Sequence, residues 1–272
     1  MRIRGADSVS VHDVLTGPRR EASWLGAFNS ALYLLTDSST VLAVVTHDAV
    51  RLPCAIVLPH TAAELPLARI AQPSGYPAPV VGAGEVRWLG PAGEVTVECA
   101  RRWGPSRVVT GTPRPSAVAH LRRAVGGVDV GLEPARVAAL VHAHDESAQS
   151  SAAAALLGRG PGLTPSGDDV LAGFLVGTRA FGHRAPGVER TVAATASIAT
   201  TALSAQLLHC AARGECVEQL ADIVRGLVAG TLSPATVLRL RAVGHTSGTA
   251  LAHGLLAAAA FADRRMPAGA LQ

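Results

Sequence analysis

The stretch Gly158-Arg-Gly-Pro-Gly-Leu-Thr-Pro-Ser-Gly-Asp-Asp separates two alanine-rich segments whose apolar residues recur at helical spacing. Its Thr164 suits a helix N-cap and its Pro165 suits the first helical position, which predicts that residues 166–169 form the first turn of a new helix. Adjacent acids favour a helix N-terminus for purely structural reasons. That explanation does not account for four glycines and two prolines in a dozen residues, so we predict a functional site here.

Outward from this loop, the composition changes near Thr112-Pro-Arg-Pro-Ser, where β-branched runs give way to segments with helical periodicity. Before it, β-branched runs predict a hairpin around 37–39, another around 90–93, and a strand over 50–58 that Pro53 demotes to an edge or a bulge. After it, periodicity predicts helices over 116–125, 134–144, 146–157, 165–181, 188–212, 216–229, 234–243 and 247–264. The predicted fold class is α+β, with a small β-sheet or barrel-like domain over residues 1–113 and an all-α bundle over residues 114–272.

The amino-acid composition excludes several classes of chemistry and of binding partner. All 24 basic residues are arginine, and the absence of lysine excludes Schiff-base chemistry, pyridoxal phosphate attachment and a P-loop. The net charge is only +4 and aromatic residues are 3% of the chain, so we expect no nucleic-acid partner. The sequence shows no C-x-x-C pair, no secretory signal and no apolar run that could span a bilayer. We therefore expect a cytoplasmic protein with no membrane partner.

A second loop, Gly244-His-Thr-Ser-Gly, also precedes a predicted helix and resembles the first loop. In both, Ser-Gly is followed after five residues by Gly and two large apolar residues, once Pro165 is treated as an insertion. The similarity reflects either a short internal repeat or chance in a chain rich in alanine and glycine. A true repeat would place two helix N-termini around one site.

Helix N-termini favour anions, and glycines let a ligand approach the backbone closely. We therefore predict a polar small-molecule site with Asp168, Asp169 and His245 as the catalytic candidates. The two acids would act as a general base, bind a substrate amine or amide, or hold a divalent metal such as Mg²⁺, and the sequence leaves these roles open. The substrate-binding candidates in the two loops and in the 188–212 helix are Gly160, Gly162, Thr164, Ser166, Gly167, Thr201, Ser204, Thr246, Ser247 and Gly248.

Two of these candidates have an alternative role. Thr201 and Ser204 fall on one face of the predicted 188–212 helix, where their hydroxyls either enter the site or bond back to their own helix. Without lysine, an anion would be held by backbone amides, hydroxyls and at most an arginine such as Arg159 or Arg213.

These motifs carry a resemblance to a known family. The 158–169 loop with Leu171 and Gly173, then Thr200-Thr-x-x-Ser204, Ala211-x-x-Gly214 and Gly244-His-Thr-Ser-Gly, resembles the AllH-type family of bacterial proteins. Its namesake is a subunit of the oxamate carbamoyltransferase of anaerobic allantoin degradation. The segment Ala27-Phe-Asn-Ser is similar to a region near the start of these proteins, which adds Asn29 to the substrate-binding candidates.

The resemblance implies transfer of a carbamoyl group between oxamate and phosphate, with carbamoyl phosphate as a partner molecule and with a homo-oligomer or companion subunits. One departure is Thr249-Ala250, where we expect an acid after the second Ser-Gly, so a metal or base role for that loop is in doubt. Two alternatives stay open. One is a non-catalytic binding or stabilising subunit, and the other is a stand-alone lyase, cyclase or hydrolase acting on an amide or carbamoyl substrate in specialised metabolism.

Overall fold

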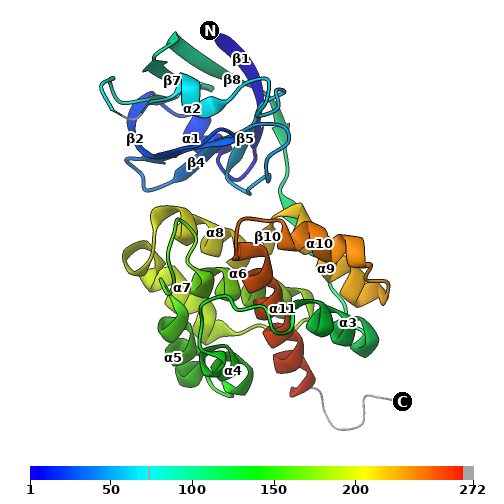
Figure 1. Ribbon diagram of the computed structural model, residues 1–272. Coiled ribbons are helices and arrows are strands. Elements are labelled where there is room, and N and C mark those ends of the chain that lie inside the picture. The colour runs from blue at the N-terminus through cyan, green and yellow to red at the C-terminus, as the bar shows by residue number, and fades with distance from the viewer. Residues whose placement is uncertain (73, 266–272) are drawn as a thin grey trace. The chain divides into compact units, whose positions relative to one another are not determined.

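The computed structural model describes residues 1–72 and 74–265, in a compact unit over Met1–Pro105 and a second unit that begins at Ser106 (Figure 1). The first unit is built mainly of strands and the second mainly of helices. The predicted α+β class, with strands first and helices after, is confirmed in this broad arrangement.

The N-terminal unit is a closed barrel with the strand order β1-β5-β4-β3-β2-β6-β7-β8. Neighbouring strands are antiparallel except for β1 with β8 and β4 with β5, which are parallel. Closure pairs the edge strands that an open sheet would leave exposed. The elements are β1 (Arg2–Ser8), α1 (His12–Thr16), β2 (Arg20–Ala27), β3 (Ala31–Thr36), β4 (Val41–Val45), β5 (Ala55–Val57), α2 (Leu67–Ile70), β6 (Val80–Gly82), β7 (Glu85–Gly90) and β8 (Gly93–Trp103).

Both predicted hairpins are confirmed. β3 pairs with β4 in a register that places Ala31 opposite Val45, and β7 pairs with β8 up to the Gly90 and Gly93 pair. Gly93 has φ of +87°, a left-handed conformation that glycine adopts without strain. The predicted strand over 50–58 is wrong in length, because only Ala55–Val57 pairs; Pro53, which lacks an N–H, lies outside it.

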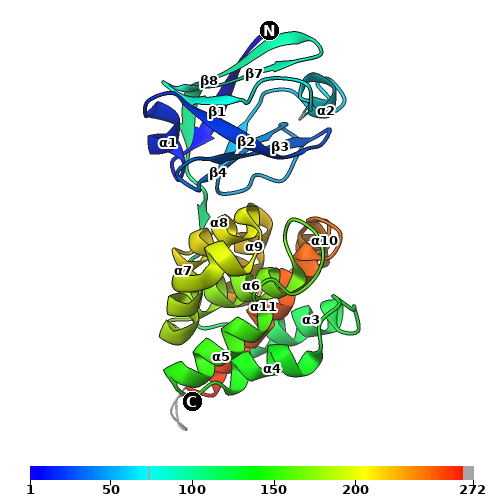
Figure 2. The ribbon, with the colours of Figure 1, turned by 90° about the vertical axis from the view of Figure 1, so that its left-hand side faces the viewer.

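In the helical unit, α6 (Ser166–Ala180) runs through the middle (Figures 1 and 2). Every residue of α6 except Arg179 is buried, as expected for a helix covered on all sides. Phe174 of α6 packs edge-to-face on Phe261 of α11, with ring centroids 5.4 Å apart. The other helices are α3 (Pro115–Val125), α4 (Pro134–His142), α5 (Glu146–Leu156), α7 (Pro186–Ala199), α8 (Ala202–Ala212), α9 (Glu218–Ala229), α10 (Pro234–Arg241) and α11 (Ser247–Asp263).

Two predictions for this unit need correction. The unit is not purely α-helical, because β9 (Ser106–Arg107) and β10 (Glu215–Cys216) form a two-stranded antiparallel sheet. The predicted helix over 188–212 is two helices, α7 and α8, which are separated at Thr200 and Thr201. The break occurs because the Thr201 hydroxyl accepts a hydrogen bond from the Ser204 N–H and so caps a new helix. In the part of the chain that the structure describes, no helix is both long enough and apolar enough to cross a membrane.

Candidate functional site

The N-termini of α6 and α11 meet. The Thr164 hydroxyl lies 3.0 Å from the Ser247 hydroxyl, and the Ser166 hydroxyl lies 3.5 Å from that of Thr246. The two Ser-Gly loops, which are far apart in the sequence, therefore lie side by side. The sequence left open whether the two loops lie together, and the structure brings them together; we call Thr164, Ser166, Thr246 and Ser247 the hydroxyl cluster.

The packing of α6 on α11 is reciprocal. A methyl group added to Gly173 would lie 2.1 Å from the Leu251 carbonyl oxygen, and one added to Gly254 would lie 2.0 Å from the Val170 carbonyl oxygen. Gly173 is the counterpart of Gly254 in the predicted repeat, and Val170 is the counterpart of Leu251. Equivalent residues thus exchange equivalent contacts, as around a local two-fold axis.

The loops that lead into α6 and α11 each fold back on the residues before them. The Gly167 N–H donates to the Arg159 carbonyl at 2.8 Å, and the Gly248 N–H donates to the Val243 carbonyl at 2.9 Å. A methyl group on Gly167 would lie 2.0 Å from the Leu156 carbonyl oxygen of α5; one on Gly248 would lie 1.8 Å from a carbonyl oxygen of α10. The two loops differ in length, since the acceptor lies eight residues before Gly167 and five residues before Gly248. Both glycines, predicted as ligand contacts, allow a helix to start close against the helix before it.

Two glycines earlier in the first loop are required by the backbone conformation. Gly160 has φ of +117° and Gly162 has φ of +92°, a region that other residues rarely adopt. The predicted cap is wrong, because α6 begins at Ser166, Pro165 occupies the cap position and no side chain caps it. The Thr164 hydroxyl instead reaches across to Ser247.

Asp168, in the first turn of α6, is buried and accepts hydrogen bonds at both carboxylate oxygens. One of its carboxylate oxygens accepts from the Gly158 N–H at 2.8 Å. The other accepts from the Ser204 hydroxyl at 2.8 Å and from the Thr200 hydroxyl. Asp168 therefore ties the first loop to the start of α8. Sequence reasoning selected Ser204 but not Thr200, although the adjacent Thr-Thr pair before a cap position was a usable signal.

Loss of the Asp168 charge is expected to destabilise the fold. The change Asp168→Asn puts an amide group among three donors, so it leaves at least one buried donor unpaired and weakens the others. We expect the free energy of unfolding, measured by chemical denaturation, to fall by about 3 kcal/mol. The control is Asp263→Asn at the exposed end of α11, which should be neutral. Equal stability of the Asp168 variant and the unchanged protein would contradict this role.

Asp169 is the acid of the site that has one unpaired oxygen. Its side chain is 7% exposed, and its Oδ2 atom has no hydrogen-bond partner among the described residues. Burial raises its pKa from 3.8 to about 7, and the negative charge on Asp168 adds to this, while the nearby Ser247 and Thr164 hydroxyls pull the pKa down. An acid with such a pKa exchanges its proton readily at neutral pH, which suits a general acid or base.

The remaining predicted residues are placed as follows. His245 is exposed in the loop before α11. The Thr201 hydroxyl donates to the Leu163 carbonyl and caps α8, so it serves the loop and the helix together. Asn29 lies in the barrel unit, where its backbone carbonyl accepts a hydrogen bond from the Leu67 N–H.

The two candidate arginines differ. Arg213 contacts the carboxylate of Glu215 at 2.9 Å and the sulfur of Cys210 at 3.3 Å. Arg159 is exposed at the start of the first loop. Of the two, Arg159 is therefore the one whose charge is available to an anion.

The described residues offer no ready set of side-chain ligands for the divalent metal considered above. Among residues 1–72 and 74–265, no three His, Cys, Asp or Glu side chains gather so that they could hold a metal ion. Both oxygens of Asp168 already accept hydrogen bonds from the protein, which leaves Asp169 as the acid of this pair with a free oxygen.

Comparison with known proteins points to the same region. The family model for "Oxamate carbamoyltransferase subunit AllH" matches residues 156–259. This confirms the predicted resemblance over that range, which runs from the end of α5 into α11 and contains every predicted site residue except Asn29. No solved structure matches the chain.

Proposed function

We propose that this chain is a subunit of a carbamoyl-transfer enzyme, and that it binds the carbamoyl or amide group of a small substrate at the joined N-termini of α6 and α11. The observation that carries the proposal is Asp169, a buried carboxyl group with an unpaired oxygen beside the hydroxyl cluster. The family match over residues 156–259 supports the proposed reaction class.

The chemistry of the cluster suits such a group. A carbamoyl group offers N–H donors and one carbonyl acceptor. The free oxygen of Asp169 takes an N–H, and the carbonyl oxygen accepts from whichever of the Thr164 and Ser247 hydroxyls is not donating to the other. The positive ends of two helix dipoles meet there, and they stabilise negative charge that develops on a carbonyl or phosphate oxygen.

Asp169 then serves as the proton carrier. When the amide nitrogen of oxamate attacks the carbamoyl carbon of carbamoyl phosphate, a C–N bond forms, phosphate leaves and the nitrogen loses a proton to the Asp169 carboxylate. In the reverse direction, a phosphate oxygen attacks the carbamoyl carbon, the C–N bond breaks and protonated Asp169 returns the proton to the nitrogen. A pKa of about 7 lets one carboxyl group perform both steps.

The exposed side chains of the two loops complete the proposed site. Arg159 and His245 are both exposed, one in each loop, and we assign to them the contact with phosphate. The matched family is named for a subunit, so we further propose that companion subunits complete the enzyme. The isolated chain would then bind substrate, while turnover would need the partners.

Binding tests the proposal without the partners. We expect the purified chain to bind oxamate or carbamoyl phosphate in isothermal titration calorimetry, and Ser247→Ala and Thr164→Val to weaken that binding about tenfold each, since each removes one hydrogen bond. Ser151→Ala, at an exposed position of α5, is the matched control and should bind normally. Unchanged binding by both site variants, or no binding by the chain either alone or with companion subunits, would overturn the proposal.

A further inference from the structure

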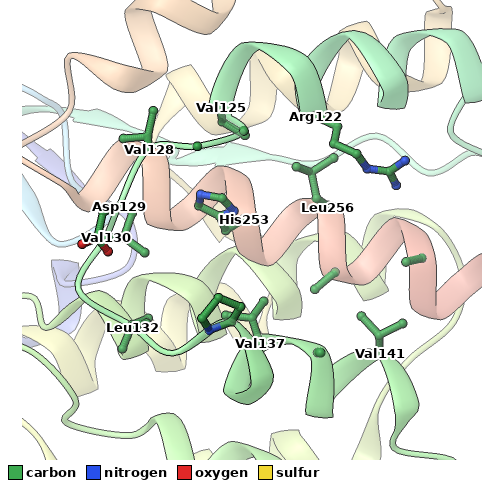
Figure 3. A pocket seen from close by; sticks show the side chains of 16 residues that line it. Arg122, Val125, Val128, Asp129, Val130, Leu132, Val137, Val141, His253 and Leu256 are labelled. Carbon is green, nitrogen blue, oxygen red and sulfur yellow. The ribbon is translucent and has the colours of Figure 1, made fainter.

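The helical unit contains a cleft that is separate from the hydroxyl cluster. It lies between α3, α4, the connecting segment 126–133 and one side of α11, and its volume is about 560 Å³ (Figure 3). Known small-molecule sites range over about 300–1,000 Å³. The lining is mainly apolar and includes Val125, Val137, Val141, Leu256 and Ala257. None of its residues belongs to the site described above.

One polar side chain stands in the middle of this lining. His253 of α11 lies among the apolar residues, between Val125 and Leu132 (Figure 3). Its Nε2 atom is buried and has no hydrogen-bond partner among the described residues. An unpaired buried acceptor or donor costs about 1–3 kcal/mol, so a partner for this atom is strongly favoured.

The ring is a hydrogen-bond acceptor at Nε2. Burial lowers the pKa of His253, and hydrogen bonding to the Val128 backbone opposes this only in part, so the ring is neutral at pH 7. A neutral imidazole has one donor nitrogen and one acceptor nitrogen. The donor nitrogen of His253 bonds to the Val128 backbone, and we therefore assign Nε2 as the acceptor nitrogen.

The charges at the cleft do not select a charged ligand. Arg122 and Asp129 are exposed and lie on opposite sides of His253 (Figure 3). They have opposite signs, and one Asp129 oxygen already accepts from the Gly131 N–H at 2.8 Å. The rest of the lining carries no charge, so a charged ligand would lose hydration without gaining a partner inside the cleft.

One wall of the cleft can adjust. The segment 126–131 contains Gly126, Gly127 and Gly131, and the last two have φ of +80° and +72° with open space where a β-carbon would lie. Glycine-rich backbone of this kind moves at low cost. A ligand group can therefore reach Nε2 as this wall shifts.

We propose that this cleft binds an uncharged small molecule with an apolar body of up to about three rings and one hydroxyl or N–H group that donates to Nε2 of His253. The upper limit on size follows because the cleft volume of about 560 Å³ is between three and four times that of apolar cavities of about 150 Å³, which hold one benzene ring. The proposal is independent of the function assigned to the hydroxyl cluster.

Two probes that differ by one hydroxyl group test it. We expect 2-naphthol to bind the full chain, as followed by its fluorescence, and His253→Leu to weaken it about tenfold through loss of one hydrogen bond. Naphthalene, which lacks the donor, should bind both proteins within a factor of two. Ala138→Trp fills the cleft from an exposed position of α4 and should block both probes, whereas Ala139→Trp, the exposed neighbour outside the lining, should block neither.

Three results would overturn the proposal. The first is no binding of 2-naphthol by the unchanged chain at millimolar concentration. The second is equal binding by the Ala138→Trp and Ala139→Trp variants, which would place the probe elsewhere. The third is an equal effect of His253→Leu on both probes, which would show that the histidine only shapes the fold.

Discussion

Replacing Asp169 with asparagine is expected to lower the turnover number at least 100-fold in the assembled enzyme. An amide cannot accept the proton that the attacking nitrogen releases, and general acid or base catalysis typically contributes 10²- to 10⁴-fold. Asparagine keeps the size of the side chain and one oxygen for a substrate N–H, so KM should change much less. Steady-state kinetics with oxamate and carbamoyl phosphate measures both constants.

The matched control for this variant is the neighbouring acid. Asp168→Asn removes the same charge one residue away, but Asp168 is occupied by protein donors, so we expect its main effect on stability. A folded Asp169→Asn protein with normal turnover would refute the catalytic role. A large loss for Asp168→Asn alone, in a protein that is folded, would move that role to the other acid.

Adding a methyl group at Gly254 is expected to destabilise the protein by about 3 kcal/mol or to prevent folding. The new atom would lie 2.0 Å from the Val170 carbonyl oxygen and 2.8 Å from the Phe174 backbone nitrogen. Because both contacts are backbone atoms of α6, no side-chain rotation relieves them. The free energy of unfolding from chemical denaturation, or the yield of folded protein by circular dichroism, measures the effect.

The direction of the stability change distinguishes a close helix crossing from an ordinary glycine inside a helix. Glycine to alanine inside a helix normally stabilises by up to about 1 kcal/mol, so a large loss reports the close crossing of α6 and α11. Gly173→Ala should behave like Gly254→Ala because its contact with Leu251 is the reciprocal one. Gly104→Ala, at a position with no atom within 4 Å of the added methyl group, is the control. Stability of Gly254→Ala equal to that of the control would show that the two helices do not cross this closely.

Local sequence signals predicted much of the fold. The β-branched runs on either side of Asp37 and the turn glycines at 90 and 93 define two hairpins that the structure contains. Strand β2 was missed because Arg20–Ala27 has no β-branched run and is held by its neighbours in the barrel. The break at Thr200 was missed because apolar periodicity continues across it, and only the Thr201 cap ends one helix and starts another.

The sequence singled out the two loops that carry the candidate site, but not the difference between their side chains. The repeated Ser-Gly pattern left open whether the ends of α6 and α11 meet, and the Thr164 to Ser247 contact shows that they do. Asp168 and Asp169 are indistinguishable in the sequence, since the difference arises from Thr200 and Ser204, which lie more than 30 residues further on. The cleft at His253 joins residues of three helices and had no signal in the sequence.

The pH dependence of stability in Asp169→Asn reports the raised pKa of the buried Asp169 carboxyl, and its measurement needs neither substrate nor partner. The native pKa of Asp169, about 7, lies above its ordinary value of 3.8, so the native state binds this proton more tightly than the unfolded chain does. The burial of Asp169 therefore leaves the free energy of unfolding unchanged below about pH 4. As the pH rises, burial of the charged carboxylate lowers that free energy increasingly, by at most about 4 kcal/mol above pH 7.

We expect chemical denaturation to show that Asp169→Asn is more stable than the unchanged protein at pH 8 by a few kcal/mol, with a much smaller gain at pH 5. A variant that is less stable at both pH values, or whose stability difference does not change with pH, would show that Asp169 is an ordinary paired carboxylate. It would then not be the proton carrier proposed here.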